Sequence, residues 1–501
     1  MKNPHYWCTW HTQNSVSRQR FGEKPDPVLF EGDQGAKLAR AVLNEDFLFG
    51  ENGAAWQFPQ FRDKLYFMLD DGWDVSYQTH PDRNRHLFSS LILDAERFPS
   101  FPGKPWERLA RLNERLKQIG WRGLGIWVAC QNFEEHEEGP KSSAEEIRAF
   151  WSERFEWCQK AGIEYVKVDW GARCEDADYR SEMTQLAHLF APGLLVEHAR
   201  PCRPINDVLR SNRFPCWEPV HTDFLKIAEF SDVFRIYDTA PQLSVSSTLD
   251  RCASLLAELP NDSSALLNCE DELYLGAGLG LCVAPMRSSL SKGEMPRKDP
   301  TAINSRITEI QRVLAWFSLA PAFSKQDVRH PPFLLSSPEL LEDSWHFEEG
   351  DFWWGELNGK TIVQSAPSVV SRDLPCPVVT SKDAILPFVV SCRYPNGCTA
   401  ISFLPRMIDG KLLYPEADAF LRSSPGTFGI FGRFSSLRIE TELPVNYRVR
   451  ARDLACNTDT DVTDRVTITE NSVTISGELA RSLCRNPDGD QSQPGICVTI
   501  E

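Results

Sequence analysis

The sequence predicts an α/β protein in which a (β/α)8 barrel is followed by a C-terminal antiparallel β-sandwich, and three observations support this. Up to about residue 330, short apolar runs alternate with longer stretches of helical period, which is the pattern of strands joined by crossover helices. From about residue 340, short alternating strands are separated by Asn-Gly and Asp-Gly turns. The length of 501 residues suits one large barrel and one smaller unit. We therefore place the barrel at residues 1–335 and the sandwich at residues 336–501.

Eight strands are expected in the barrel, each a short apolar run that ends at a polar residue or a turn. They are 6–9, 64–69, 123–130, 163–168, 193–197, 233–237, 265–268 and 279–284. Helices are expected near 106–119, 143–161, 248–258 and 304–318, and Ser143 with Glu146 forms a capping box before the second of them. Eight strands and their helices in about 320 residues match a closed barrel. The sandwich is expected to hold about eight strands, with a loop at 485–495 before a last edge strand.

Composition and charge exclude several classes of partner. The 54 basic and 70 acidic residues give a net charge of −16, which repels phosphate backbones, so no nucleic-acid partner is expected. The chain has no run of 18 apolar residues, and its start, MKNPHYWCTW, has no apolar signal core. We therefore expect no membrane partner and a cytoplasmic location.

Cysteine and tryptophan usage gives two further expectations. The 15 cysteines show no CxxC pair and no zinc spacing, so free thiols are expected, without a metal or another cofactor. His11 and His198 lie near strand ends but lack paired ligands, and we assign no metal to them. The 15 tryptophans weakly favour a carbohydrate partner, because an indole stacks on a sugar ring, although large cores also use tryptophan. The aromatic excess and the sandwich are also compatible with a homodimer.

Carboxylates that follow predicted strands are candidates for chemistry, because the active face of a parallel barrel lies at the carboxyl ends of its strands. Breaking an acetal between sugars needs two carboxyl groups that flank the bond. Asp169, after the fourth strand, is the candidate nucleophile, and Lys167 lies on the same strand face and would keep it ionised. The alternative is that Asp169 only caps the following helix.

The second carboxyl group is assigned to Asp238, after the sixth strand, as general acid/base, with Arg235 placed to orient it or a substrate hydroxyl. Asp232, Glu270 and Asp271 are alternatives for the acid/base role. The candidate substrate-binding residues also lie near strand ends: Asp70 and Asp71 as acceptors for ring hydroxyls, Glu197 after the fifth strand, and Trp10 and Trp73 as stacking surfaces. For each tryptophan, the alternative is packing in the core.

Four segments resemble a known clan of enzymes. They are YWCTW, LDDGW, GIEYVKVDWG and TEIQRVLAWFSLAPAFSKQDVR. Together they are similar to glycoside hydrolase families 27 and 36, which comprise retaining α-galactosidases, α-N-acetylgalactosaminidases and raffinose-synthase-like enzymes. WCTW and DDGW are closest to the raffinose-synthase branch, whereas the order of barrel and sandwich matches family 27. The resemblance covers about residues 5–330.

The resemblance implies a role for each candidate residue. Asp169 of the Lys167-Val168-Asp169 motif would be the nucleophile, and Asp238 would be the acid/base that follows Arg235. Asp70 and Asp71 would bind the 4- and 6-hydroxyls of galactose, Trp10 would stack on the sugar, Trp73 would complete the DDGW motif, and Glu197 would contact the 2-position.

The chain departs from the family pattern at four places. Asp238 is three residues beyond Arg235 where family 27 has four, and LLNCEDELYLG replaces the family's GGWNDPDML, which leaves the roles of Glu270 and Asp271 open. Two family cysteines are replaced by Gly72 and Gly171, which agrees with a reducing compartment.

The leading hypothesis is therefore a retaining exo-glycosidase of α-galactosidase type that forms a glycosyl-aspartate. The alternatives are galactosyl transfer to another sugar, action on α-N-acetylgalactosaminides or β-L-arabinopyranosides, and a non-catalytic carbohydrate-binding barrel. Arg200 and Arg203 indicate either an anionic sugar substituent or a solvated loop.

Overall fold

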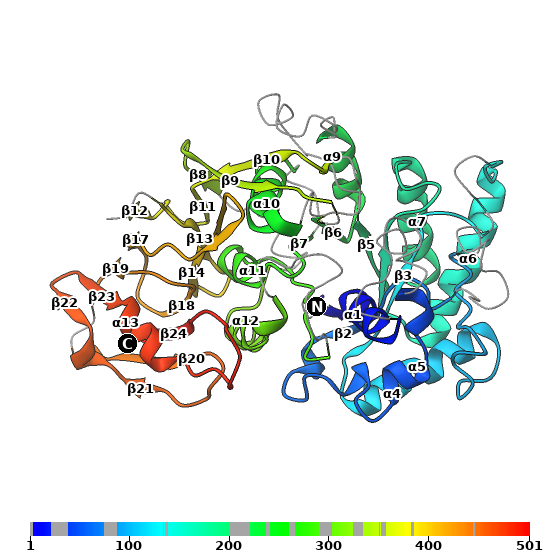
Figure 1. Ribbon diagram of the computed structural model, residues 1–501, viewed down its shortest axis with the longest axis horizontal. Helices are drawn as coiled ribbons and strands as arrows, with labels where there is room; N and C mark the ends of the chain where they lie inside the picture. Colours follow the sequence, from blue (N-terminus) through cyan, green and yellow to red (C-terminus); the bar gives the residue numbers. More distant parts are fainter. Residues whose placement is uncertain are drawn as a thin grey trace.

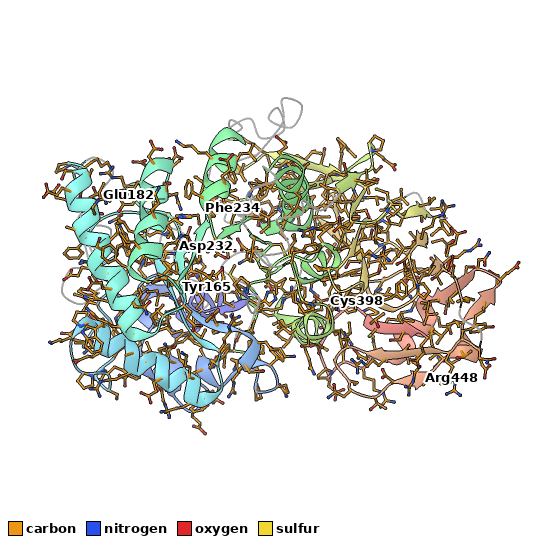
Figure 2. The ribbon with its side chains drawn as sticks, turned by 180° about the vertical axis from the view of Figure 1, so that it is seen from behind. Tyr165, Glu182, Asp232, Phe234, Cys398 and Arg448 are labelled. Carbon is orange, nitrogen blue, oxygen red and sulfur yellow. The ribbon has the colours of Figure 1, made fainter. Side chains whose placement is uncertain are left out.

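The computed structural model describes residues 4–501 apart from a set of internal segments. These segments are 22–38, 75–87, 134, 136–138, 200–220, 237–240, 260–265, 291–302, 324–333, 350, 352–356, 382–384 and 444–445. Figure 1 shows the N-terminal strands and helices on one side, the β-rich C-terminal part on the other, and two helices, α11 and α12, between them. Figure 2 shows the reverse view, with Tyr165 among the N-terminal strands and Arg448 in the C-terminal part.

The N-terminal part contains a seven-stranded parallel sheet in which each strand pairs with the next one in the sequence. The strands are β1 (Tyr6–Cys8), β2 (Tyr66–Leu69), β3 (Gly123–Val128), β4 (Tyr165–Val168), β5 (Leu195–Ala199), β6 (Val233–Arg235) and β7 (Leu266–Asn268). The first seven predicted strands are therefore all present. Sequential order and parallel pairing place the carboxyl ends of all seven at one edge.

The eighth predicted strand, 279–284, is not a strand in the structure. The first residue of that apolar run, Leu279, ends the helix α11 (Leu273–Leu279), and Gly280 stops the helix in the left-handed conformation with φ of +66°. The following residues contact both outer strands. The Cys282 N–H donates to the Leu267 carbonyl at 2.9 Å in a parallel bridge beside β7, and the Cys8 N–H donates to the carbonyl of Pro285 at 3.0 Å. Residues 281–285 thus lie between β7 and β1 without a regular ladder.

Helices join the strands, as predicted. They are α1 (Trp10–Phe21), α4 (Glu45–Phe49), α5 (Pro105–Ile119), α6 (Ala144–Ala161), α7 (Ala177–Phe190), α9 (His221–Phe230), α10 (Ser244–Glu258) and α12 (Thr308–Leu319). The predicted capping box is present, because the Glu146 N–H donates to Ser143 Oγ and the Ser143 N–H donates to the Glu146 carboxylate.

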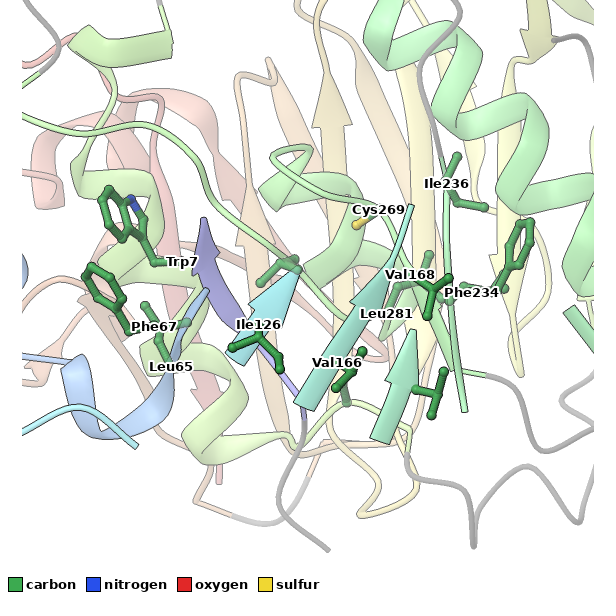
Figure 3. Close-up of a cluster of buried hydrophobic side chains, with 14 of the residues drawn as sticks. Trp7, Leu65, Phe67, Ile126, Val166, Val168, Phe234, Ile236, Cys269 and Leu281 are labelled. Carbon is green, nitrogen blue, oxygen red and sulfur yellow. The ribbon is translucent and has the colours of Figure 1, made fainter. Parts of the chain in front are cut away.

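Alternation along the strands separates two environments. One set of side chains is apolar and belongs to the large hydrophobic core; Figure 3 labels Phe67, Ile126, Val166 and Phe234 among them. The other set forms a separate cluster between the strands that includes Tyr6, Cys8, Tyr66, Met68, Tyr165, Leu195, Val233 and Leu266. Beyond this cluster, toward the carboxyl ends, the same strand face carries buried charged groups.

Two large sheets hold most of the described strands of the C-terminal part. The larger is ordered β21-β20-β24-β18-β14-β13-β11-β8, and the smaller is ordered β12-β17-β19-β23-β22. The strands of the larger sheet are β8 (Leu334–Ser336), β11 (Val369–Arg372), β13 (Phe388–Arg393), β14 (Thr399–Leu404), β18 (Thr427–Phe431), β20 (Val449–Asp453), β21 (Thr460–Asp461) and β24 (Gly495–Ile500). Those of the smaller sheet are β12 (Val378–Thr380), β17 (Asp418–Arg422), β19 (Ser436–Glu440), β22 (Thr467–Thr469) and β23 (Ser472–Ser476). Apolar residues of both sheets share one core.

Two expectations about this part were wrong. The sheets are mixed, because β11 with β13, β14 with β18, and β17 with β19 are parallel pairs. The last strand, β24, lies between β18 and β20 and is not an edge strand. The predicted Asn-Gly and Asp-Gly turns are present in two further hairpins, β9 (Leu340–His346) with β10 (Thr361–Pro367) and β15 (Arg406–Ile408) with β16 (Lys411–Leu413). A short helix, α13 (Gly477–Leu483), follows β23.

The larger sheet is covered on its other face by α11 and α12, so the two parts of the chain share a core. Gly278 permits this contact, since a Cβ there would meet Val390 Cγ2 at 2.3 Å. A buried ion pair also joins the two parts, because Arg312 on α12 donates to both Asp453 oxygens at 2.8 and 2.9 Å.

We predict that Arg312→Ala lowers the free energy of unfolding by about 3–5 kcal/mol, because it leaves the buried Asp453 carboxylate unpaired. Urea denaturation measures this change. The matched control is Arg422→Ala, which breaks the largely exposed pair with Glu440 and is expected to cost less than about 1 kcal/mol. If both variants lose a similar free energy of unfolding, the buried pair of Arg312 and Asp453 contributes no more than an exposed pair, which would contradict the prediction.

Candidate active site

Five charged side chains form a chain of alternating sign at the carboxyl ends of the strands. In order they are Asp70, Lys167, Asp169, Arg235 and Glu270, and we call them the charge chain. Successive members are joined by contacts of 2.7, 3.4, 3.7 and 2.8 Å. Each residue is at most 8% exposed, so the pairing offsets the cost of removing the charges from water. The sequence-predicted residues Asp70, Lys167, Asp169 and Arg235 are thus brought together.

Asp169 lies at the centre of the charge chain, directly after β4. Its Oδ2 accepts a hydrogen bond from the indole N–H of Trp127 at 3.0 Å, and the same oxygen faces Lys167 Nζ at 3.4 Å and Arg235 Nη1 at 3.7 Å. None of these three contacts uses Oδ1. Asp169 does not cap the next helix, because the N-cap of α7 is Asp176. The carboxylate is therefore oriented through one oxygen by one hydrogen-bond donor and two cations, which suits a group that reacts through the other oxygen.

Asp70 and Lys167 form the other end of the charge chain. Asp70 Oδ2 accepts from Lys167 Nζ at 2.7 Å and from the Cys8 thiol at 3.0 Å. Burial would raise the pKa of Asp70, but Lys167 and the Cys8 hydrogen bond bring it below its ordinary value. Burial and Arg235 oppose the charge of Lys167, yet its acidic neighbours raise the pKa of Lys167 above the ordinary value. Asp70 and Lys167 are therefore a charged pair at neutral pH.

Asp71 pairs with Arg40, whereas the adjacent Asp70 pairs with Lys167. Arg40 donates to Asp71 through Nε at 2.8 Å and Nη2 at 2.7 Å, a bidentate pair that sequence reasoning missed. Burial raises the pKa of Asp71 despite the opposing effect of Arg40. The Arg40 guanidinium also lies over the rings of Phe88 and Trp170, at 4.7 and 5.7 Å from their centroids. Arg40 and Asp71 are 31 residues apart, and the sequence gives no signal for this pairing because it forms only in the folded chain.

Glu197 was expected after the fifth strand, at the opening, but it lies within β5 and is fully buried. Its Oε1 accepts from the Tyr6 hydroxyl, and its Oε2 accepts from the Tyr165 hydroxyl and the Asn268 amide, each at 2.7 Å. In the sheet register Glu197 is opposite Lys167, one pleat below Asp169. Both oxygens are thus occupied by protein donors, and the position corrects the expectation that Glu197 follows its strand.

The two candidate stacking residues lie in different surroundings. Trp73 is fully buried in the hydrophobic core, and its indole donates to the Trp127 carbonyl at 2.8 Å, so the structure places it as a packing residue. Trp10 begins α1 and is partly buried beside the cluster between the strands. A further aromatic group was missed by sequence reasoning: Trp170, directly after Asp169, packs against Trp127 and Phe88.

The remaining predicted residues divide into two groups. Asp238, Arg200 and Arg203 lie outside the described residues. Of the alternatives for the acid/base role, Asp232 lies just before β6 and accepts hydrogen bonds from His188 and from the Val196 N–H. Asp271 pairs with Arg287 at 3.0 Å. These two carboxylates therefore have structural partners, and Glu270 is the alternative that belongs to the charge chain.

The described residues contain neither a candidate metal site nor a helix that could cross a membrane. There, no group of three or more His, Cys, Asp or Glu side chains is arranged to hold a metal ion. Among the same residues, no helix is both long and apolar enough to cross a membrane.

The chain was compared with known proteins. No protein-family model and no curated protein matches it. Among solved structures it is similar to a family 27 β-L-arabinopyranosidase from Geobacillus stearothermophilus, with 10% identity, a TM-score of 0.40 and coverage of 100% of this chain and 96% of that one. It is also similar to a protein named as an alpha-galactosidase/melibiase from Bacteroides fragilis, with 10% identity, a TM-score of 0.38 and coverage of 100% of this chain and 79% of that one. The similarity to an Anoxybacillus alpha-amylase has 10% identity, a TM-score of 0.42 and coverage of 99% of this chain and 97% of that one.

Asp74, which follows the DDGW motif, generates a pH-dependent prediction. It is buried, its Oδ2 accepts from the Leu91 N–H at 3.2 Å, and burial raises its pKa from 3.8 to about 7. Because the folded state then binds more protons than the unfolded state between about pH 4 and pH 7, stability falls as the pH rises through this range.

We expect Asp74→Asn, which stays neutral, to remove this part of the pH dependence. Denaturant unfolding of both proteins at several values from pH 4 to pH 8 should show the variant gaining stability relative to the native chain as the pH rises. Two parallel stability curves would contradict the assignment.

Proposed function

We propose that the chain is a retaining, exo-acting glycoside hydrolase of the α-galactosidase type. The observation that carries the proposal is Asp169, a buried carboxylate at the end of a parallel strand whose Oδ2 faces Trp127, Lys167 and Arg235 together. A nucleophilic carboxylate must stay ionised and hold one orientation, and two cations with one indole donor serve both requirements. The motif resemblance assigns the same residue to this role.

The reaction proceeds by double displacement. Asp169 attacks the anomeric carbon, the glycosidic C–O bond breaks, and Asp238 gives its proton to the leaving oxygen. In the second step Asp238 takes a proton from water, the water oxygen attacks the same carbon, and the bond to Asp169 breaks. We expect the two carboxyl groups to lie about 5–5.5 Å apart, the separation that retention requires.

The surrounding residues bind the sugar in this proposal. Asp70 and Asp71 accept hydrogen bonds from ring hydroxyls, and the pairs that each forms with Lys167 or Arg40 keep the carboxylates in place. Trp10 is partly exposed and supplies an apolar surface, whereas Trp73 supports the site from the core. We further infer that residues 281–285 close the seven strands into a barrel, since they hydrogen-bond to both β7 and β1.

The test compares Asp169→Asn with the native chain on aryl glycosides of α-galactose, α-N-acetylgalactosamine and β-L-arabinopyranose. Loss of the nucleophile is expected to lower kcat by roughly 10⁴-fold or more on whichever glycoside the native chain cleaves. The proton spectrum of the first product formed should show the anomeric configuration of the substrate.

The control is Asp178→Asn, because Asp178 is 88% exposed on α7 and should leave turnover unchanged. Unchanged turnover in Asp169→Asn, or a product of inverted configuration, would contradict the proposal. An added sugar acceptor in the same assay distinguishes transfer from hydrolysis.

A further inference from the structure

We infer that Glu270 is a positioning residue that holds Arg235 in place against Asp169. This inference deepens the proposed function and rests on Asp169 as the nucleophile. Glu270 follows β7, is 8% exposed, and its Oε1 lies 2.8 Å from Arg235 Nε. The same guanidinium turns Nη1 toward Asp169 Oδ2 at 3.7 Å. Glu270 therefore engages one edge of the guanidinium while another nitrogen faces the nucleophile.

The backbone of Glu270 is fixed in an unusual conformation. Its φ of +52° lies in the left-handed region, which a glutamate has no local reason to prefer. Three interactions hold it there: the Glu270 N–H donates to Asn268 Oδ1 at 2.9 Å, the Ala284 N–H donates to the Glu270 carbonyl at 2.9 Å, and the side chain pairs with Arg235. Such strain persists only where the surrounding structure imposes it, and it gathers at functional sites.

The charges explain why Arg235 needs this partner. Arg235 and Lys167 are two buried cations that both face Asp169, and they oppose each other's charge. Glu270 adds a negative group on the far side of Arg235, so that the chain alternates in sign along its whole length. Glu270 thus draws Arg235 away from the carboxylate of Asp169, which has to attack.

The pairing also decides between positioning and proton donation. A carboxyl group that gives its proton to a leaving oxygen must be protonated at the working pH and must reach the substrate. Burial raises the pKa of Glu270, although Arg235 opposes the rise, so reach is the criterion that decides. Glu270 Oε1 lies 2.8 Å from Arg235 Nε, and this oxygen is therefore turned toward the protein. Its contribution therefore passes through Arg235.

The kinetic test uses Glu270→Gln, Arg235→Lys and the double variant. The rate of covalent labelling of Asp169 by a 2-deoxy-2-fluoro glycosyl fluoride reports the first chemical step. Glu270→Gln is expected to slow this step by about 10- to 100-fold, with kcat affected more than KM, because small misplacements of reacting groups have costs of this order. If Glu270 acts through Arg235, the double variant should be no slower than Arg235→Lys alone.

Two kinetic results would overturn the inference. If the fold losses in labelling rate of the two single variants multiply in the double variant, Glu270 acts independently of Arg235. A loss confined to substrates with poor leaving groups and restored by azide would make Glu270 the proton donor.

The matched control is Asp271→Asn. Asp271 is the next residue and is also a carboxylate paired with an arginine, but its partner is Arg287 at 3.0 Å, outside the charge chain. This variant should lower Tm and leave the labelling rate of the folded protein unchanged. If Asp271→Asn lowers the labelling rate as far as Glu270→Gln does, any disturbance of this segment slows the reaction. That result would overturn the positioning role of Glu270.

A second measurement separates this inference from the proposed function. If the native chain neither cleaves nor is labelled by any of the glycosides, the proposed function fails. The Tm values of the variants still report whether Glu270 is coupled to Asp169 through Arg235. The Tm losses of Glu270→Gln and Asp169→Asn should be non-additive when Arg235 is present and additive in the Arg235→Lys background. Additive losses in both backgrounds would overturn the positioning role.

Discussion

Charges buried between the strands must be paired, and this requirement organises the carboxyl end of the sheet. The charge chain from Asp70 to Glu270 takes its members from the ends of β2, β4, β6 and β7, so its contacts can form only when these strands hold their register. One pleat below, Glu197 accepts from Tyr6, Tyr165 and Asn268, which ties β1, β4, β5 and β7 together. The site and the sheet are therefore stabilised by the same polar contacts.

The strands and four members of the charge chain could be predicted from the sequence because they depend on local periodicity. Alternation with period two places Lys167 and Asp169 on one face, and the structure shows Lys167 Nζ 3.4 Å from Asp169 Oδ2. Arg40, Trp127 and Asn268 could not be assigned, because each acts on a residue far away in the sequence. Glu270 was an open alternative for acid/base, and only its contact with Arg235 indicates another role.

The errors in the predicted fold have a common cause. The apolar run that ends α11 has no periodicity that separates a buried helix from a buried strand, so part of it was assigned to an eighth strand. In the C-terminal part, turns identified the hairpins correctly but gave no information about pairing between strands far apart in the sequence. The parallel pairs and the central place of β24 come from such distant contacts.

The larger C-terminal sheet has no solvent face over its central strands, because the smaller sheet covers one side and α11 and α12 cover the other. Gly278 brings α11 against this sheet, and α11 begins three residues after Glu270. A chain cut after α12 would therefore expose a large apolar surface on the N-terminal half and release the segment that sets the Glu270 backbone. The two halves share one core, and the C-terminal part thereby supports the segment that carries Glu270 to the edge of the parallel sheet.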